Sequence, residues 1–234
     1  MDEIVILTGA GVSAESGLGT FRDVGGLWDT YDLEDVATPQ GYSRNPALVH
    51  DFYNARRANC VGAAPNAAHY ALAELEAAWP GRVYLVTQNI DDLHERAGHK
   101  RVHHMHGELM RALCAACGHR WDAPAEMSPA THCPKCHASA ARPDVVWFGE
   151  IPHGMEDIWS ALCRADLFVS IGTSGTVYPA AGFVAEAAAH GAATLELNLD
   201  PSDTSAYFEE RRLGPATELV PAWVAEMLMH KQSA

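Results

Sequence analysis

Four cysteines form a C-x2-C-x15-C-x2-C array made of Cys114, Cys117, Cys133 and Cys136. Two thiolates separated by two residues can reach one ion from a tight turn, and a second such pair closes the tetrahedral, water-free shell of a structural zinc site. Two disulfides or four buried thiols are the alternative. A chain with no export signal, however, belongs in a reducing compartment, where disulfides seldom persist. The array therefore predicts one structural Zn²⁺.

A glycine-rich turn near the N-terminus has the composition of a phosphate-binding loop. Residues 9–14, Gly-Ala-Gly-Val-Ser-Ala, follow an apolar segment and match G-x-G-x-x-A. In such loops backbone N–H groups and a helix N-terminus hold a pyrophosphate. The acidic residue that usually ends a second strand about twenty positions on is missing, because that region is irregular and carries only Glu34 and Asp35. The loop indicates a dinucleotide but disfavours an ordinary hydride-transferring dehydrogenase.

Strands and helices alternate along the chain and must position these groups. The patterns predict strands at 3–8, 83–87, 167–171 and 194–199, and helices at 46–57, 66–79, 154–165 and 180–190. Asn45 with Pro46, and Asn66, are the expected helix caps. Residues 18–44 fit neither period and are expected to form a long mobile loop. The alternation predicts an α/β fold with a Rossmann-like parallel sheet, helices on both faces and a small zinc-containing insertion.

Charge and hydropathy restrict the class of protein. The formal charge of −14 opposes nonspecific binding to nucleic acid or anionic membranes, and suits basic polypeptide substrates better. No apolar stretch has the length needed to span a bilayer, and the first apolar segment is too short for a signal peptide. We therefore expect a cytoplasmic monomer with no membrane partner and no direct nucleic-acid partner.

Several motifs, taken in order and spacing, resemble the sirtuin family over nearly the whole chain. They are Gly9 to Gly17, Thr20-Phe21-Arg22, Thr87-Gln88-Asn89-Ile90-Asp91, His106-Gly107, the paired cysteines, Gly172-Thr173-Ser174 and Asn198-Leu199. Sirtuins are NAD-dependent protein-lysine deacylases with a large Rossmann-like domain and a small domain that contains a zinc ribbon. The resemblance implies a large domain from about 1–28, 64–108 and 145–234, and a small domain from about 29–63 and 109–144.

The resemblance also implies an active site. In sirtuin chemistry the acyl oxygen of an acylated lysine attacks C1′ of the nicotinamide ribose, and a histidine, here His106, then activates a ribose hydroxyl. Asn89 and Asp91 complete the catalytic set, with Asp91 at the nicotinamide carboxamide and Asn89 and Gln88 at the ribose and water. Without the resemblance, Asn89 and Asp91 would suit a turn equally well. The other implied NAD-binding residues are Gly9, Ala10, Gly11, Ser13, Ala14, Phe21, Arg22, Trp28, Ile90, Gly172, Thr173, Ser174, Asn198, Leu199, Asp200 and Ala216.

Tyr53 and Arg56 lie three residues apart on the predicted 46–57 helix and share a face. On spacing alone they read as a core tyrosine and a solvated arginine. Class III, desuccinylase-like sirtuins have Tyr-x-x-Arg here, which implies that the pair binds the carboxylate of succinyl-lysine or malonyl-lysine. A planar guanidinium suits a carboxylate, and the small Ala37 leaves room for the longer acyl group.

The segment from Val145 to Glu150 is the expected peptide-binding edge. By resemblance, Val146, Trp147, Phe148, Gly149 and Glu150 pair through their backbone with an extended substrate. The alternative is an ordinary buried strand, because valine and aromatic residues favour strands.

The resulting interpretation is an NAD-dependent deacylase that prefers succinyl and malonyl groups over acetyl and yields nicotinamide, 2′-O-acyl-ADP-ribose and free lysine. A mainly deacetylating enzyme and a mono-ADP-ribosyltransferase are alternatives at the same cofactor. A nonenzymatic NAD-responsive binding module is an alternative of another class. His106 together with Asn89 and Asp91 argues against that module, because binding NAD requires no base.

Overall fold

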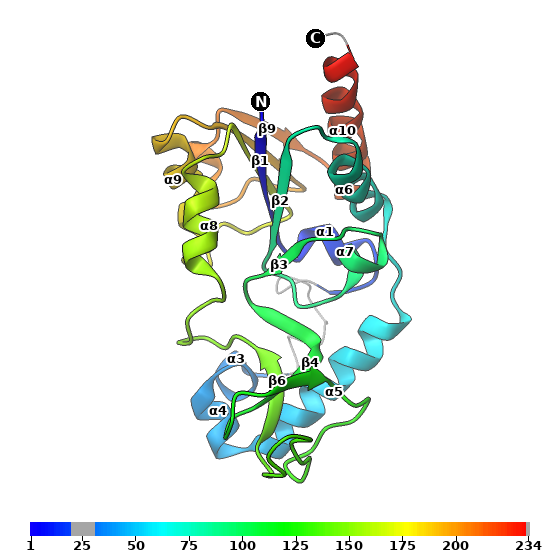
Figure 1. The fold of residues 1–234 in the computed structure, drawn as a ribbon, viewed down its shortest axis with the longest axis vertical. Helices are drawn as coiled ribbons and strands as arrows, with labels where there is room; N and C mark the ends of the chain where they lie inside the picture. The colour runs from blue at the N-terminus through cyan, green and yellow to red at the C-terminus, as the bar shows by residue number, and fades with distance from the viewer. Residues whose placement is uncertain (20–30, 233–234) are drawn as a thin grey trace.

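The larger of two β-sheets is parallel and six-stranded (Figure 1). The structure is a computed structural model that describes residues 1–19 and 31–232. The strand order is β3-β2-β1-β7-β8-β9, so the direction of winding reverses between β1 and β7. Ligand crevices of α/β sheets form at such a switch point. The strands are β1 (Glu3–Thr8), β2 (Arg82–Thr87), β3 (Val102–His104), β7 (Leu167–Ile171), β8 (Ala193–Asn198) and β9 (Glu210–Leu213).

Helices cover both faces of this sheet. The helices α6 (Ala67–Ala78) and α10 (Ala216–Gln232) lie on one face, and α8 (Met155–Leu162) and α9 (Phe183–Ala189) lie on the other (Figure 1). Strand β1 shows why both faces need cover: successive side chains of a strand point to opposite faces of the sheet, and those of residues 4–7 in β1 are apolar. Ile4 and Ile6 pack with residues of α6 and α10, whereas Val5 and Leu7 pack with residues of α8 and α9. The predicted α/β fold is confirmed.

A smaller antiparallel sheet and three helices form the lower part of Figure 1. The sheet has the order β5-β4-β6, with β4 (Gly107–Cys114), β5 (Arg120–Asp122) and β6 (Ala141–Val145). The helices are α3 (Leu33–Val36), α4 (Pro39–Arg44) and α5 (Pro46–Gly62). Phe52 and Tyr53 of α5 share a core with Leu109 and Trp147. The exact boundaries of the two domains stay a prediction.

The predicted helix caps are confirmed. The Asn45 side chain accepts a hydrogen bond from the Leu48 N–H at 3.1 Å, and Pro46 is the first residue of α5. The Asn66 side chain accepts from the Ala68 N–H at 3.0 Å and begins α6. Helix α5 continues to Gly62 rather than ending at residue 57.

The expectation of a single loop over residues 18–44 was wrong. The helices α3 and α4 lie within it, and they begin where Asp32 accepts from the Glu34 N–H and Thr38 accepts from the Gly41 N–H. Helices this short are set by their caps, because one or two turns show no clear hydrophobic period. The predicted 180–190 helix opens as the 3₁₀ turn η1 (Ala180–Gly182) before α9.

The remaining short elements are α1 (Gly11–Ala14), α7 (Leu93–Arg96) and η2 (Ser205–Tyr207). None of the described helices is both long enough and apolar enough to cross a membrane.

Candidate active site and zinc centre

The loops after β1 and β7 touch at the switch point of the sheet. The Gly9 N–H donates to the Ile171 carbonyl at 3.0 Å, and the Gly11 N–H donates to the Gly172 carbonyl at 2.9 Å. A Cβ atom on Gly11 would lie 2.7 Å from the Gly172 Cα. A Cβ atom on Gly9 would lie 2.8 Å from the Gly172 carbonyl oxygen. Both glycines are therefore required by the approach of two backbones.

This contact changes the expected role of the glycine loop. The N–H groups of Gly9 and Gly11 already have acceptors within the protein, and the helix α1 that follows has only four residues. The expected contact with a pyrophosphate would fall to other atoms of the loop. The cofactor role of Gly9, Ala10, Gly11 and Ala14 stays a prediction.

Ser13 joins the glycine loop to the segment after β2. Its hydroxyl donates to Asp91 Oδ2 at 3.1 Å and accepts from Asn89 Nδ2 at 3.1 Å. Asn89 and Asp91 are buried. Burial raises the pKa of Asp91, although hydrogen bonds from the Leu93 N–H and Ser13 oppose this effect. Ser13 and the distant pair Asn89 and Asp91, all predicted site residues, thus form one polar network.

His106 lies beside this network, directly before β4. Its Nδ1 lies 3.1 Å from the Gln88 carbonyl oxygen. Since a carbonyl can only accept, Nδ1 carries a proton and Nε2 is left to accept one. Burial lowers the pKa of His106, and the charge of His153 lowers it too, against the effect of the Gln88 hydrogen bond. A ring that is neutral at neutral pH is suited to act as a general base.

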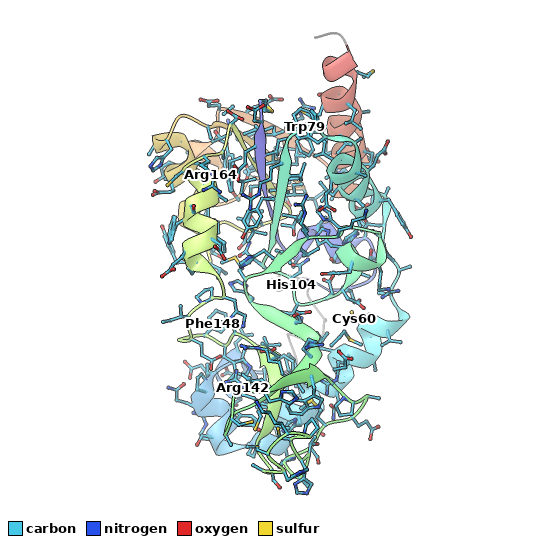
Figure 2. The ribbon with its side chains drawn as sticks, viewed as in Figure 1. Cys60, Trp79, His104, Arg142, Phe148 and Arg164 are labelled. Atoms are coloured by element: carbon cyan, nitrogen blue, oxygen red, sulfur yellow. The ribbon has the colours of Figure 1, made fainter. Side chains whose placement is uncertain are left out.

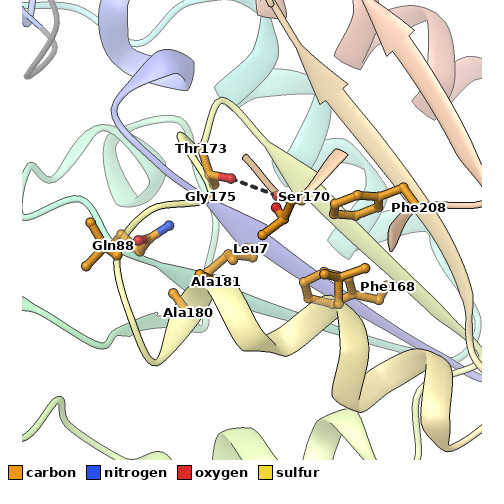
Figure 3. Close-up of a pocket in the computed structure, with 12 residues that line it drawn as sticks. Leu7, Gln88, Phe168, Ser170, Thr173, Gly175, Ala180, Ala181 and Phe208 are labelled. Carbon is orange, nitrogen blue, oxygen red and sulfur yellow. Dashed lines mark hydrogen bonds between the residues drawn. The ribbon is translucent and has the colours of Figure 1, made fainter. Parts of the chain in front are cut away.

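The predicted phosphate and adenosine residues lie at the carboxyl ends of β7 and β8. Asn198 Nδ2 donates to the Thr173 carbonyl at 2.7 Å, and the Thr173 hydroxyl lies 3.0 Å from that of Ser170 (Figure 3). Ser174 Oγ lies 2.7 Å from Thr176 Oγ1. A narrow pocket beside this loop is lined by Gln88, Thr173 and Gly175, among others.

The other predicted cofactor residues differ in how far the structure places them. Leu199 and Asp200 are exposed directly after β8, Ala216 begins α10, and Ile90 is buried in the core beside α5. Phe21, Arg22 and Trp28 lie outside the described residues.

Tyr53 and Arg56 of α5 lie close to the Asp91 network. The Tyr53 side chain is buried, and the Arg56 guanidinium carbon lies 5.9 Å from the centroid of its ring. Burial lowers the pKa of Arg56, and nearby Tyr53, Asp91 and Cys60 oppose this effect. A solvated basic face is therefore the wrong reading of this helix, and Arg57, the residue next in sequence, is fully buried.

Ala37 is buried and tied to the predicted substrate segment. Its carbonyl accepts a hydrogen bond from the Phe148 N–H at 2.9 Å. The Phe148 side chain is 49% exposed and lies at the edge of the molecule in Figure 2. The residue after α3 and the segment after β6 are thus held together.

The segment 145–150 is not a continuous open strand edge. Strand β6 ends at Val145 and a turn follows, in which the Glu150 N–H donates to the Trp147 carbonyl at 2.9 Å. The Val146 N–H donates to the His106 carbonyl at 2.9 Å, and the Trp147 N–H donates to Glu150 Oε2 at 2.8 Å. These N–H groups already have acceptors within the protein, so pairing with a substrate would fall to other backbone groups of the segment. The substrate-binding role of residues 146–150 stays a prediction.

The four cysteines of the array come together at one end of the small sheet. The sulfurs of Cys114 and Cys136 lie 3.6 Å apart, and those of Cys117 and Cys133 lie 3.8 Å apart. Four sulfurs about 2.3 Å from one Zn²⁺ in a tetrahedron would be about 3.8 Å from each other. All six cysteines of the chain are free thiols. The thiol set therefore fits structural zinc and not a pair of disulfides.

Two side chains that support this site were missed by the sequence analysis. His69 Nε2 lies 3.3 Å from Ser13 Oγ, and burial lowers the pKa of His69 to about 4. Arg142 makes two hydrogen bonds to Glu150, of 2.7 and 2.9 Å, and stacks 3.5 Å from the centroid of the Trp147 ring. No spacing pattern marks either residue, because their partners are distant in sequence or lie across a turn.

Comparisons with known proteins agree with this geometry. A model of the Sir2 family matches residues 9–179. A Caulobacter vibrioides protein named NAD-dependent protein deacylase is 62% identical over 97% of this chain and 97% of its own length. A Yersinia pestis protein of the same name is 54% identical over 96% of this chain and 82% of its own length.

Solved structures are similar over the same extent. An NAD complex of a Sir2 homologue superposes with a TM-score of 0.90 at 38% identity, covering 98% of this chain and 90% of that chain. An ADP-ribose complex of a Sir2 homologue variant gives a TM-score of 0.90 at 38% identity, covering 99% of this chain and 93% of that chain.

Proposed function

Because the chain belongs to the Sir2 family, we propose that it uses NAD to remove acyl groups from protein lysines and prefers succinyl and malonyl groups over acetyl. Relatives named NAD-dependent protein deacylase support the general reaction. NAD is the co-substrate, Cys114, Cys117, Cys133 and Cys136 hold a structural Zn²⁺, and proteins with acylated lysines are the substrates.

The residues around the switch point of the sheet have separate roles in the proposed reaction. NAD, when bound, would supply an electrophilic ribose carbon, at which the bond to nicotinamide breaks as the bond to the acyl oxygen forms. Asp91 and Asn89, fixed by Ser13, hold the nicotinamide end and the ribose in place. His106 keeps its Nδ1 proton on the Gln88 carbonyl and takes the proton of a ribose hydroxyl at Nε2.

The acyl preference rests on Tyr53 and Arg56. The Arg56 guanidinium is half-buried beside the Tyr53 ring and senses the charge of Asp91, so the pair lies next to the proposed nicotinamide site. A succinyl carboxylate would bring an opposite charge to this guanidinium, whereas an acetyl group brings neither charge nor acceptor. A charge-assisted hydrogen bond is worth about 1.5–3 kcal/mol, which corresponds to about a ten- to hundredfold preference.

The deciding experiment compares succinyl-lysine and acetyl-lysine versions of one peptide, with and without NAD. Deacylated peptide, nicotinamide and acyl-ADP-ribose are followed by mass spectrometry. We expect NAD-dependent turnover of both peptides, with a kcat/KM at least about tenfold higher for the succinyl form.

Two arginine variants separate recognition from nonspecific charge effects. Arg56→Met should reduce desuccinylation far more than deacetylation, while Arg101→Met, an exposed matched control, should leave the ratio unchanged. A preference for acetyl in the wild-type protein would remove the role of Tyr53 and Arg56. ADP-ribose attached to protein without deacylation would indicate a transferase, and NAD binding without turnover of either peptide would indicate a binding module.

A further inference from the structure

His104, the last residue of β3, lies between two hydrogen-bond acceptors. Its Nδ1 is 3.1 Å from the Asn89 carbonyl oxygen, and its Nε2 is 2.7 Å from Glu95 Oε1 of α7. The side chain is only 9% exposed. Figure 2 shows His104 where the chain passes from the larger sheet toward the smaller one.

Both partners determine the protonation of this ring. A backbone carbonyl and an ionised carboxylate can only accept, so each ring nitrogen must donate and the ring is an imidazolium. Burial lowers the pKa of His104, but the hydrogen bond and charge of Glu95, the Asn89 carbonyl and the charge of Glu108 together raise it above its ordinary value. The stability that this pair contributes is thus fully present below about pH 6.5 and is lost as the pH rises through the folded-state pKa.

The other titratable groups around His104 are part of the same site. The charge of His104 lowers the pKa of Asp91, and it also lowers that of His94 on α7, which burial already holds well below its ordinary value. His104 therefore adds a positive charge to this cluster, as Arg56 does beside Asp91, and its acidic neighbours are Glu95, Glu108 and Asp91.

Two histidines hold two successive carbonyl groups. His106 contacts the Gln88 carbonyl, and His104 contacts the Asn89 carbonyl, each at 3.1 Å. Two further polar groups of Asn89 are also held, since its N–H donates to Thr87 Oγ1 at 3.0 Å and its Nδ2 donates to Ser13. The backbone from residue 88 to residue 89 is thereby clamped to the segment that carries the proposed base.

We propose that His104 is a positioning residue, which in its imidazolium form holds the Asn89 carbonyl and so orients Asn89 and Asp91 toward the cofactor. The inference rests on the proposed roles of Asn89 and Asp91. Loss of the second proton from His104 removes one of its two donors and releases either Glu95 or the Asn89 carbonyl. Deacylation should therefore decline as the pH rises through the titration of His104, while the neutral form of His106 is needed at the acidic side.

The first test changes the charge of Glu95 without changing its shape. Glu95→Gln should move the alkaline limb of the kcat/KM profile toward lower pH by about one unit, because a neutral amide stabilises the imidazolium less. Glu186→Gln is the matched control, since it removes the same charge from the exposed His190–Glu186 pair at the end of α9, and it should leave the alkaline limb in place. If the alkaline limb of the kcat/KM profile lies at the same pH in Glu95→Gln and Glu186→Gln, the proposal is overturned.

A second variant removes the ring itself. His104→Gln has a donating nitrogen at only one of the two ring positions and does not titrate, so it should lower kcat by about tenfold or more, leave the KM for peptide unchanged and abolish the alkaline limb. If kcat falls but the alkaline limb of the kcat/KM profile stays where it is in the wild-type protein, His104 has a structural role only and the proposal is overturned.

Nuclear magnetic resonance decides the same question without turnover, and also if His104→Gln does not fold. The amide of Ile90 belongs to the same peptide group as the Asn89 carbonyl, so its shift should follow the titration of the His104 ring above pH 6.5, and both should move together in Glu95→Gln. A His104 pKa that is not raised above the ordinary value of about 6.5, or an Ile90 amide shift that does not follow the ring, would refute the proposal. If the wild-type protein deacylates no peptide, the proposed function fails, whereas this titration still tests the clamp.

Discussion

The phenol oxygen of Tyr53 accepts a hydrogen bond of 3.0 Å from the indole Nε1 of Trp147, and both side chains are buried. An indole N–H can only donate, so the Tyr53 O–H proton is not used in this hydrogen bond. The Arg142 guanidinium stacks on the Trp147 ring and donates two hydrogen bonds to the Glu150 carboxylate. A chain of contacts therefore fixes Tyr53 beside Arg56, and its O–H donates to none of the side chains that the structure describes.

Tyr53→Phe should destabilise the protein and weaken desuccinylation. The variant leaves the Trp147 N–H buried without an acceptor, which costs about 1–3 kcal/mol, and it removes the donor proposed for the acyl carboxylate. Denaturant unfolding and the succinyl-to-acetyl ratio of kcat/KM measure the two effects. The exposed Tyr70→Phe is the control. Unchanged stability in Tyr53→Phe would show that the indole finds another partner.

His106→Ala should abolish deacylation while the fold and the bound zinc remain. General-base catalysis contributes about 10²- to 10⁴-fold, and no other described side chain contacts the Gln88 carbonyl in this way. Because burial lowers the pKa of His106, the base form persists to lower pH, and the acid limb of the wild-type profile should lie below pH 6.5. Steady-state kinetics across pH checks this, and turnover by the alanine variant would rule out the assignment.

Gly11→Ala should lower the free energy of unfolding by about 1–3 kcal/mol, as overpacking does. The added Cβ would lie 2.7 Å from the Gly172 Cα, where only backbone could move. Gly62→Ala is the control, because no heavy atom lies within 4 Å of its Cβ position at the end of α5. Thermal unfolding compares Gly11→Ala with Gly62→Ala. Equal unfolding midpoints would mean that the loops after β1 and β7 can move apart with little loss of stability.

Cys117→Ser should lose the metal and unfold the small sheet around it. Structural zinc contributes folding free energy directly, and a site with three thiolates binds it less tightly. Metal analysis should find one zinc per chain in the wild-type protein and in the exposed-thiol control Cys163→Ser, but less in Cys117→Ser, with a lower thermal midpoint. Full zinc content in Cys117→Ser would place the ion elsewhere.

The amino-acid sequence determined the features that depend on near neighbours along the chain. The zinc thiols, the caps at Asn45 and Asn66 and the alternation of strands and helices follow from spacing, because their partners lie within one turn or one short module. The order of the motifs indicated the family, which the comparisons then showed.

Tertiary structure alone decided which distant side chains meet. Ser13 and Asp91 are 78 positions apart, and Tyr53 and Trp147 are 94 apart. Such pairs form because β1 lies beside β2 and β7 in the sheet, an arrangement that the period of a single strand does not encode. The same holds for the turn after Val145 and for the two glycines against Gly172, since a backbone hydrogen bond depends on which strand is adjacent and not on residue type.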